Sequence, residues 1–177
     1  GNCTISAASG SCTASLNITQ LVNGSKLADG TYTINASVMN ATVAGRGFTT
    51  NYANLTTIII DTTEPNEVNK SSSLAAGTNH SVYNLGGNLT LNVTTRDATA
   101  GVEVVIFIIK NNTGGVNDTV TAILEGGNTY SSSINTSHYP DGNYSILIFV
   151  NDTAGNFNAT ANSTAIGWNS IKFDSSA

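Results

Sequence analysis

The chain has 177 residues, which suits one or two domains, and 40% of them are hydrophobic, which is enough to bury a core. Only 10% are charged, against about 25% in typical domains, and the net charge is −5. The lack of a basic stripe argues against nucleic acid as a partner. The lack of an apolar run of about 18 residues predicts no membrane span.

Both cysteines, Cys3 and Cys12, lie in the first segment on either side of a Ser-Gly turn signal. The leading interpretation is a hairpin disulfide formed in an oxidising compartment. Two buried thiols and a bond to another subunit are the alternatives. The spacing matches no zinc pattern, because His80 and His138 are far apart in the sequence. The abrupt start at Gly1, without a signal peptide, fits a processed precursor or a segment of something longer.

Period-two alternation recurs along the chain, and no stretch shows a sustained helical period. Residues 30–38 alternate apolar and polar side chains, and residues 56–60 form a second apolar strand before a linker that ends at Pro65. Beyond it, seven strands are predicted near 67–72, 88–95, 102–110, 118–124, 129–135, 143–151 and 158–166. The class is therefore all-β.

The segment LADGTYTINASV (27–38) matches YPDGNYSILIFV (139–150) at an offset of 112 residues. This pattern, followed by NDTAGN and by a strand ending in DTT-x-P, resembles the tandem immunoglobulin-like repeats of archaeal and bacterial cell-surface, surface-layer and pilus-like fibre proteins. The resemblance implies two immunoglobulin-like β-sandwich domains in tandem, at residues 1–63 and 64–177. It implies no single activity.

Residues 1–63 are too short for the seven strands of such a sandwich, and they align from near its third strand. The missing strands could precede Gly1, or this unit could be a small complete variant. The favoured alternative is that the incomplete domain takes a strand from a neighbouring subunit. The tail, with Trp168, Ile171 and Phe173, is a candidate donor strand, and a long last strand of its own domain is the alternative.

Asn-x-Ser/Thr glycosylation signals, or sequons, are far more frequent than chance predicts. Serine and threonine together make up 44 of the 177 residues, or about a quarter. A shuffled sequence with the same 24 asparagines would therefore contain roughly 6 sequons. The chain has seventeen, at Asn2, Asn17, Asn23, Asn35, Asn40, Asn54, Asn69, Asn79, Asn88, Asn92, Asn111, Asn117, Asn135, Asn143, Asn151, Asn158 and Asn162. We expect N-linked glycans there to solvate a surface that has few charges. An acid two residues earlier, which a bacterial-type transferase requires, precedes only Asn69 and Asn143, which favours an archaeal or eukaryotic source.

Residues 101–110 and 146–150 contain no sequon and are apolar on both faces. If Ile106 and Ile146 face the core, the outward residues form an interface with other copies. A covering loop of the same domain is the alternative. The predicted interface residues, with those of the tail, are Val105, Phe107, Ile109, Leu147, Phe149, Trp168, Ile171 and Phe173.

No catalytic constellation stands out, so we expect no enzyme. Calcium is the best metal candidate, at Asp61, Glu64, Asp141 and Asp152, although lone acids at turns usually shape the turn. The sequence favours a structural subunit of an extracellular, heavily N-glycosylated fibre or pilus-like filament that assembles from copies of itself by head-to-tail strand contacts. The alternatives are a segment of a surface-layer or stalk protein, or an adhesin or carbohydrate-binding module that uses Trp168 and Tyr139.

Overall fold

A computed structural model describes residue 13 and residues 26–36, 53–72, 82–84, 87–158 and 168–174. These residues form β-strands and one short 3-10 turn, so the described part of the chain is all-β, as predicted. The chain divides into two compact units, residues 1–60 and 61–177, with the division three residues before the predicted boundary.

In the first unit, β1 (Gly30–Ala36) pairs antiparallel with β2 (Ala53–Ile60). Tyr32 and Ile34 are half-buried, whereas the alternate residues Thr31 and Thr33 are exposed, as the period-two pattern requires. The Tyr32 hydroxyl donates a hydrogen bond of 2.7 Å to the carbonyl oxygen of Ala28, four residues earlier. This bond fixes the corner at which the chain enters β1.

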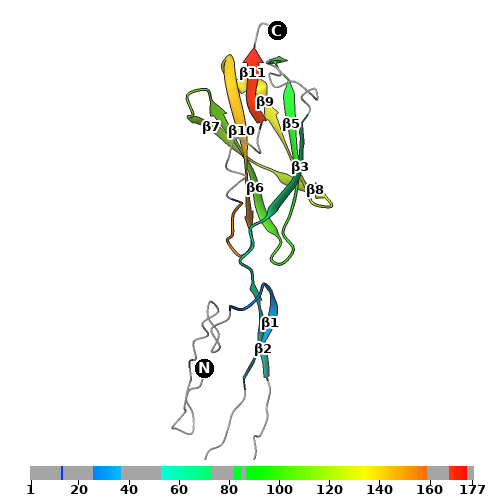
Figure 1. Cartoon of the computed structure of the whole chain (residues 1–177). Coiled ribbons are helices and arrows are strands. Elements are labelled where there is room, and N and C mark those ends of the chain that lie inside the picture. Colours follow the sequence, from blue (N-terminus) through cyan, green and yellow to red (C-terminus); the bar gives the residue numbers. More distant parts are fainter. Residues whose placement is uncertain are drawn as a thin grey trace, which may run out of the picture. The chain divides into compact units, whose positions relative to one another are not determined.

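The second unit consists of two sheets (Figure 1). One has the strand order β3-β5-β9-β8, with β3 (Asn66–Ser72), β5 (Asn88–Arg96), β9 (Thr129–Asn135) and β8 (Ile123–Gly126). The other has the order β4-β11-β10-β6-β7, with β4 (Val82–Asn84), β11 (Trp168–Asp174), β10 (Gly142–Asp152), β6 (Val102–Asn111) and β7 (Val116–Thr121). All pairs are antiparallel except β4 with β11, which is parallel. The 3-10 turn η1 (Thr136–His138) follows β9.

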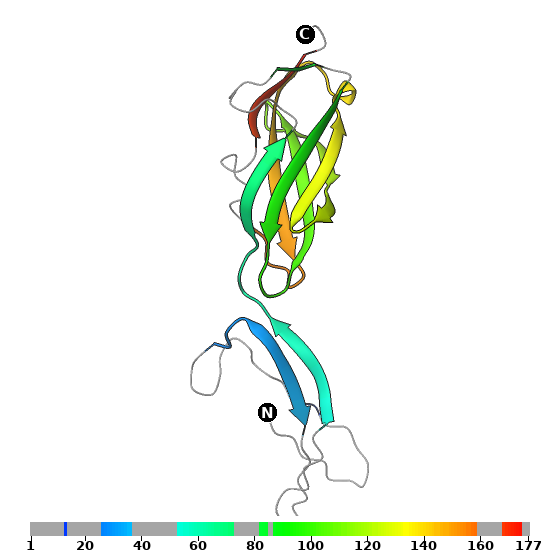
Figure 2. The same ribbon diagram turned by 90° about the vertical axis from the view of Figure 1, so that its right-hand side faces the viewer.

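The two sheets lie face to face (Figure 2), and the core of the second unit lies between them. One sheet contributes mainly Leu89, Leu91, Val93 and Ile134, and the other contributes residues of β6, β10 and β11. Leu89, Leu91 and Val93 are at most 1% exposed. The predicted alternation along residues 88–95 is therefore confirmed, with Asn88 and Asn92 on the solvent face.

An aromatic cluster closes one end of this core. The rings of Tyr139, Tyr144 and Phe173 have centroids 4.8 to 5.7 Å apart. Buried tyrosines need partners for their hydroxyl groups. The Tyr139 hydroxyl donates to Asp118 Oδ2 at 2.7 Å, and the Tyr144 hydroxyl donates to the Pro140 carbonyl at 2.9 Å. The second bond again reaches four residues back, so the two matching sequence segments form the same corner.

Three strand predictions need correction. The predicted strand 118–124 is two strands, β7 and β8, because the chain passes from one sheet to the other at Ala122. The strand β4 was not predicted, and its three residues are too few for a periodic signal. The strand that pairs with the first half of β10 is 168–174, whereas most of the predicted strand 158–166 lies outside the described residues.

Candidate functional site

Sequon asparagines lie mainly at outward positions in the described residues. The side chains of Asn35, Asn88, Asn135 and Asn143 are exposed, and those of Asn92, Asn111 and Asn151 are half-buried. Asn54, Asn69 and Asn117 lie in described strands, but their side chains are not described. The other sequons, at Asn2, Asn17, Asn23, Asn40, Asn79 and Asn162, lie outside the described residues.

Asn158 is a correction to the expectation that each sequon is exposed. Its side chain is 5% exposed, and its Nδ2 donates a hydrogen bond to the carbonyl oxygen of Pro65. Its backbone N–H donates to Val150 O at 3.0 Å. The sequence alone gives no sign of this difference, because Pro65 is distant in the chain and meets Asn158 only in the fold.

Within the described strands, two pairs of sequon asparagines are direct cross-strand neighbours. Asn88 of β5 lies opposite Asn135 of β9, and Asn35 of β1 lies opposite Asn54 of β2. Residues in such register have Cβ atoms about 4.5–5.5 Å apart on the same face of the sheet. Asn135 also caps η1, because its Oδ1 accepts hydrogen bonds from the backbone N–H and the hydroxyl of Ser137. Its Nδ2 is not used in that cap.

The outward face of β6 is the opposite of the predicted one. Val105, Phe107 and Ile109 are fully buried in the core, whereas Ile106 and Ile108 are half-buried on the outer face. The predicted interface at Val105, Phe107 and Ile109 is therefore wrong. Because this strand is apolar on both faces, its pattern could not tell one face from the other.

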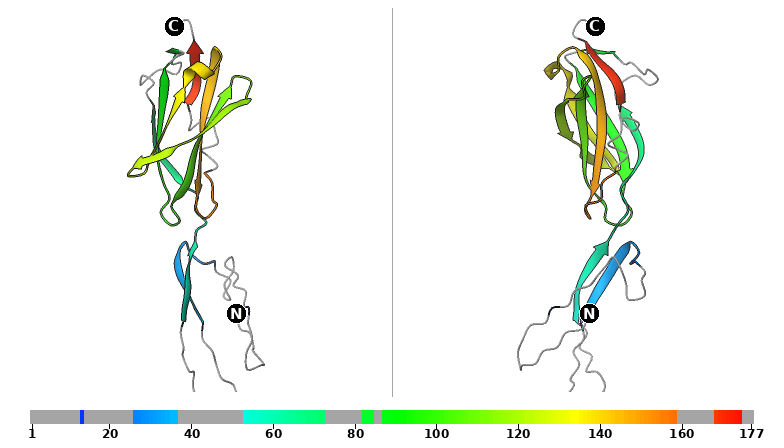
Figure 3. Two further views of the ribbon diagram at one scale, coloured as in Figure 1. Left: turned by 180° about the vertical axis from the view of Figure 1, so that it is seen from behind. Right: turned by 60° about the vertical axis from the view of Figure 1, so that its left-hand side comes forward.

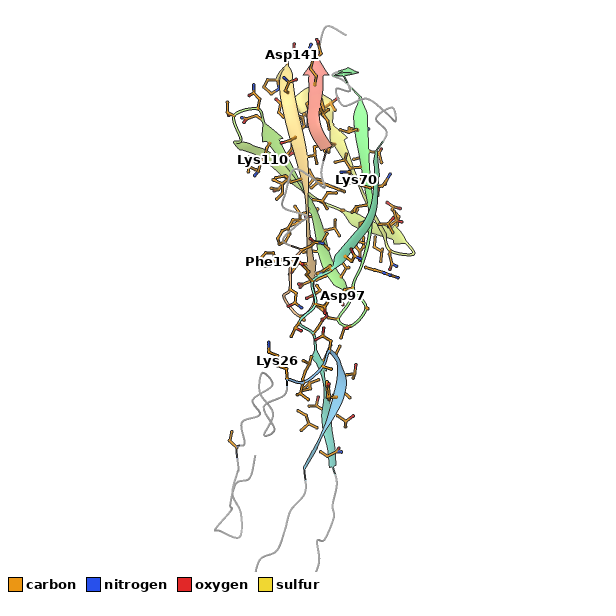
Figure 4. The ribbon with its side chains drawn as sticks, in the orientation of Figure 1. Lys26, Lys70, Asp97, Lys110, Asp141 and Phe157 are labelled. Carbon is orange, nitrogen blue, oxygen red and sulfur yellow. The ribbon has the colours of Figure 1, made fainter. Side chains whose placement is uncertain are left out.

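On β10, Ile146 faces the core, as predicted, and Leu147 and Phe149 lie on the other face. Leu147 is only 2% exposed, so it is not an open surface, and Phe149 is half-buried. The Phe149 ring stacks on Phe157 with a centroid distance of 6.1 Å, and Phe157 is 54% exposed. The outer face of β6 and β10 is thus apolar but largely covered, with Phe157 (labelled in Figure 4) as its exposed aromatic ring.

The predicted donor tail belongs to its own domain. β11 pairs antiparallel with β10, and the two strands lie side by side in Figure 3. Ile171 and Phe173 are buried in the core of the second unit, where the Phe173 ring packs against those of Tyr139 and Tyr144. Their assignment to an interface is therefore wrong. Trp168 begins β11, and its side chain is not described.

Edge strand β8 exposes two large apolar side chains that the sequence analysis missed. Ile123 is 71% exposed and Leu124 is 56% exposed. β8 is the outermost strand of its sheet, next to β9. The opposite edge strand, β3, contains the sequon of Asn69, whereas β8 contains none. The sequence feature that could have indicated this exposed edge is the segment between Asn117 and Asn135, which contains no sequon.

Three carboxylates meet at one end of the second unit. Oxygens of Asp61, Asp97 and Asp152 lie within 4.8 Å of one another. Asp61 precedes β3, Asp97 directly follows β5, and Asp152 ends β10. Sequence reasoning identified Asp61 and Asp152 but missed Asp97. The available signal was its position after a predicted strand, matching that of Asp152.

Loop N–H groups already bind these carboxylates. Asp97 Oδ1 accepts from the N–H groups of Thr99, Ala100 and Gly101, which has the left-handed φ of 81° that favours glycine. Asp152 Oδ1 accepts from Ala154 and Asn156. Ala100 N–H also donates to Asp61 Oδ2, at 3.1 Å.

The shared setting shifts two pKa values in opposite directions. Burial, with the negative charges of Asp97 and Asp152, raises the pKa of Asp61. Burial also acts to raise the pKa of Asp97, but three backbone hydrogen bonds outweigh it and lower that pKa. The donor set of carboxylate oxygens could hold a divalent cation. Turn formation accounts for the same arrangement without one.

The other two predicted calcium ligands are not in this cluster. Asp97 and Asp141 lie at opposite ends of the second unit (Figure 4), because Asp141 precedes β10 and Asp152 ends it. Glu64 is exposed and is not part of the group of three. The predicted set of Asp61, Glu64, Asp141 and Asp152 is therefore not a single site. Cys3 and Cys12 lie outside the described residues.

Comparison with known proteins gives no family for this chain: no protein-family model matches it, and no curated protein does. Within the described residues, no helix is long and apolar enough to cross a membrane.

Proposed function

We propose that the chain is a structural subunit of an extracellular, heavily N-glycosylated fibre or pilus-like filament. The subunits join by head-to-tail strand contacts between copies of the chain. Its parts have mechanical roles: the sandwich carries load and the glycans solvate and shield the surface. This function needs neither catalysis nor a metal.

The observation that carries the proposal is the excess of sequons on a chain with few charges. Seventeen sequons stand where roughly 6 are expected from composition, while only 10% of the residues are charged. Four of the sequon side chains are exposed and three are half-buried in the described residues, against one that is buried. A hydrated glycan at these positions supplies the polar coat that charged side chains supply in typical domains.

Both units are immunoglobulin-like in this proposal. The order of strands in the second unit supports this assignment, and so does the hydrogen bond from the Tyr144 hydroxyl to the Pro140 carbonyl, which resembles a tyrosine corner. The first unit repeats the corner at Tyr32. Its register also corresponds, since Tyr32 lies opposite Ile58 as Tyr144 lies opposite Ile171.

In this proposal β1 and β2 take the places that β10 and β11 have in the second unit, and the repeated register supports this correspondence. In the described part of the first unit the sheet has two strands, and a two-stranded sheet is marginally stable alone, so its apolar face needs a partner. In the proposed fibre, a strand from a neighbouring copy completes this incomplete domain. That strand is not β11, which fills the core of its own domain.

Two apolar surfaces among the described residues are candidates for contacts between copies: β8 has no sequon, whereas the outer face of β10 also has the sequon asparagines Asn143 and Asn151. One is edge strand β8, with Ile123 and Leu124 exposed. The other is the outer face of β6 and β10 around Phe149 and Phe157. Exposed apolar edges promote pairing with other chains unless they are blocked. A contact that uses different surfaces on the two partners propagates into a filament.

Negative-stain electron microscopy of material purified from the native source tests the proposal. We expect fibres with a regular axial repeat. Isolated particles at all concentrations would contradict a fibre and favour a surface-layer segment or a binding module. A glycan-array signal that requires Trp168 would single out the binding module.

A further inference from the structure

Asn158 is a sequon asparagine that the fold uses for another purpose. Its Nδ2 donates to the carbonyl oxygen of Pro65, which directly precedes β3. Its backbone N–H donates to Val150 O, and Phe157 next to it forms an antiparallel bridge with Asn151. One buried residue therefore joins the end of β10 to the start of β3, across the two sheets.

We propose that N-glycan transfer to this chain acts on the folded second unit and leaves Asn158 unmodified. The inference rests on the proposed function, because it requires that the other sequons carry glycans. The fold, and not the tripeptide alone, then selects the modified asparagines. Asn158 is a positioning residue that connects two sheets.

The chemistry of transfer explains the exclusion. The new bond forms between Nδ2 and the anomeric carbon of a sugar activated as a glycosyl diphosphate. The bond from that carbon to its phosphate oxygen breaks, and one Nδ2 proton is lost. The diphosphate leaves with the bonding electron pair. Nδ2 of Asn158 is already in hydrogen-bond contact with Pro65 O, and its side chain is 5% exposed, so neither the enzyme nor the sugar has access.

Two sequons on the preceding strand, β10, differ from that of Asn158 in exposure. Asn143 is exposed and Asn151 is half-buried, both on the outer side of β10. The Asn151 Nδ2 donates to Glu103 Oε2 at 3.2 Å, but this contact is at the surface. Either asparagine can accept a sugar without opening the core, whereas Asn158 cannot.

A glycan added to Asn158 before folding would prevent the contact with Pro65. Nδ2 of a glycosylated asparagine keeps one N–H, but the attached sugar would have to occupy the close-packed space around this buried contact. The chain would then complete its fold poorly. Transfer after folding avoids this outcome and leaves one sequon empty.

Two substitutions that remove a sequon without changing its asparagine test the inference. Thr160→Ala removes the sequon of Asn158, and Ser145→Ala removes that of Asn143. Both variants are produced in the native source, and their glycans are counted by intact mass and glycopeptide analysis. We expect Ser145→Ala to lose one glycan and Thr160→Ala to lose none.

A full-length variant that cannot fold provides the second arm. Phe107→Asp places a charge in the core and should unfold the second unit. We expect a glycan on Asn158 in this variant and none in the wild type. A glycan on Asn158 of the folded wild type would overturn this inference but not the proposed function. An unmodified Asn158 in the unfolded variant, with other sequons occupied, would have the same consequence. Absence of glycans at all sequons would overturn the proposed function as well.

Discussion

At the scale of single residues, the acidic cluster shows how similar side chains acquire different roles. Asp97 has three backbone donors, which favour its ionised form, whereas Asp61 faces two like charges. From the sequence alone, both residues are acids at predicted turns and cannot be told apart. Their roles depend on loops that converge only in the fold, which is why Asp97 was missed and Asp141 was wrongly included.

Replacing each acid by its neutral isostere should therefore change stability in opposite directions. The pKa of Asp61 is raised above 3.8, so its ionisation reduces stability as the pH rises through the acid range. Asp61→Asn should be more stable relative to wild type at pH 7 than at pH 3. The pKa of Asp97 is lowered, so its stabilisation is present at pH 7 and lost as the pH falls. Asp97→Asn should destabilise by roughly 1 kcal/mol at pH 7, and less at pH 3.

Urea denaturation of the two variants and the wild type at both pH values measures these differences. If the carboxylates interact as their geometry indicates, the stability changes of the two variants have opposite signs in their pH dependence. Parallel behaviour would show that the carboxylates do not interact as their geometry indicates.

At the scale of elements, alternation predicted β5 correctly and β6 incorrectly for one physical reason. In β5, polar and apolar residues alternate, so a single register buries Leu89 and Leu91. In β6 both faces are apolar, and the sequence contains no preference for either. The prediction for the tail was wrong for a similar reason, because Ile171 and Phe173 suit a donor strand and a last strand equally well.

The two faces of β6 should respond differently to the same change. Val105→Thr places a hydroxyl in the core and should destabilise the fold by about 1–3 kcal/mol. Ile106→Thr retains a β-branched side chain on the half-buried outer face and should cost less than about 1 kcal/mol. If the outer face joins copies, Ile106→Thr should still reduce fibre formation. Thermal unfolding and electron microscopy of the two variants distinguish these effects, and unchanged fibres would exclude this face from the contact.

The facing asparagines of β5 and β9 make a prediction about glycans. Asn88 and Asn135 are register partners, with Cβ atoms about 4.5–5.5 Å apart, which is close to the width of one sugar ring. Their glycans should therefore interfere, and both sites should be occupied together less often than independent occupancies predict. Mass analysis of a limited digest that keeps both strands in one fragment gives the frequency with which Asn88 and Asn135 are both glycosylated. If the joint frequency equals the product of the two single-site occupancies, the two side chains diverge enough to hold two glycans and the prediction is wrong.

At the scale of the whole molecule, the composition predicted an all-β chain with a polar coat, and its strands are where alternation placed most of them. What composition could not predict is the pairing of distant segments, such as Asn158 with Pro65 or β11 with β10. The proposed assembly depends on both kinds of information. Sequons define where contact is blocked, and the fold defines which apolar surfaces remain.

The most direct test is the intact mass of the protein from its native source, before and after chemical removal of glycans. The polypeptide alone has a mass of 18.2 kDa. We predict a mass well above this value, distributed in steps of one glycan, which falls to the polypeptide mass after treatment. A protein that has the polypeptide mass from the start would contradict the account, because a chain with so few charges would then be without its proposed polar coat.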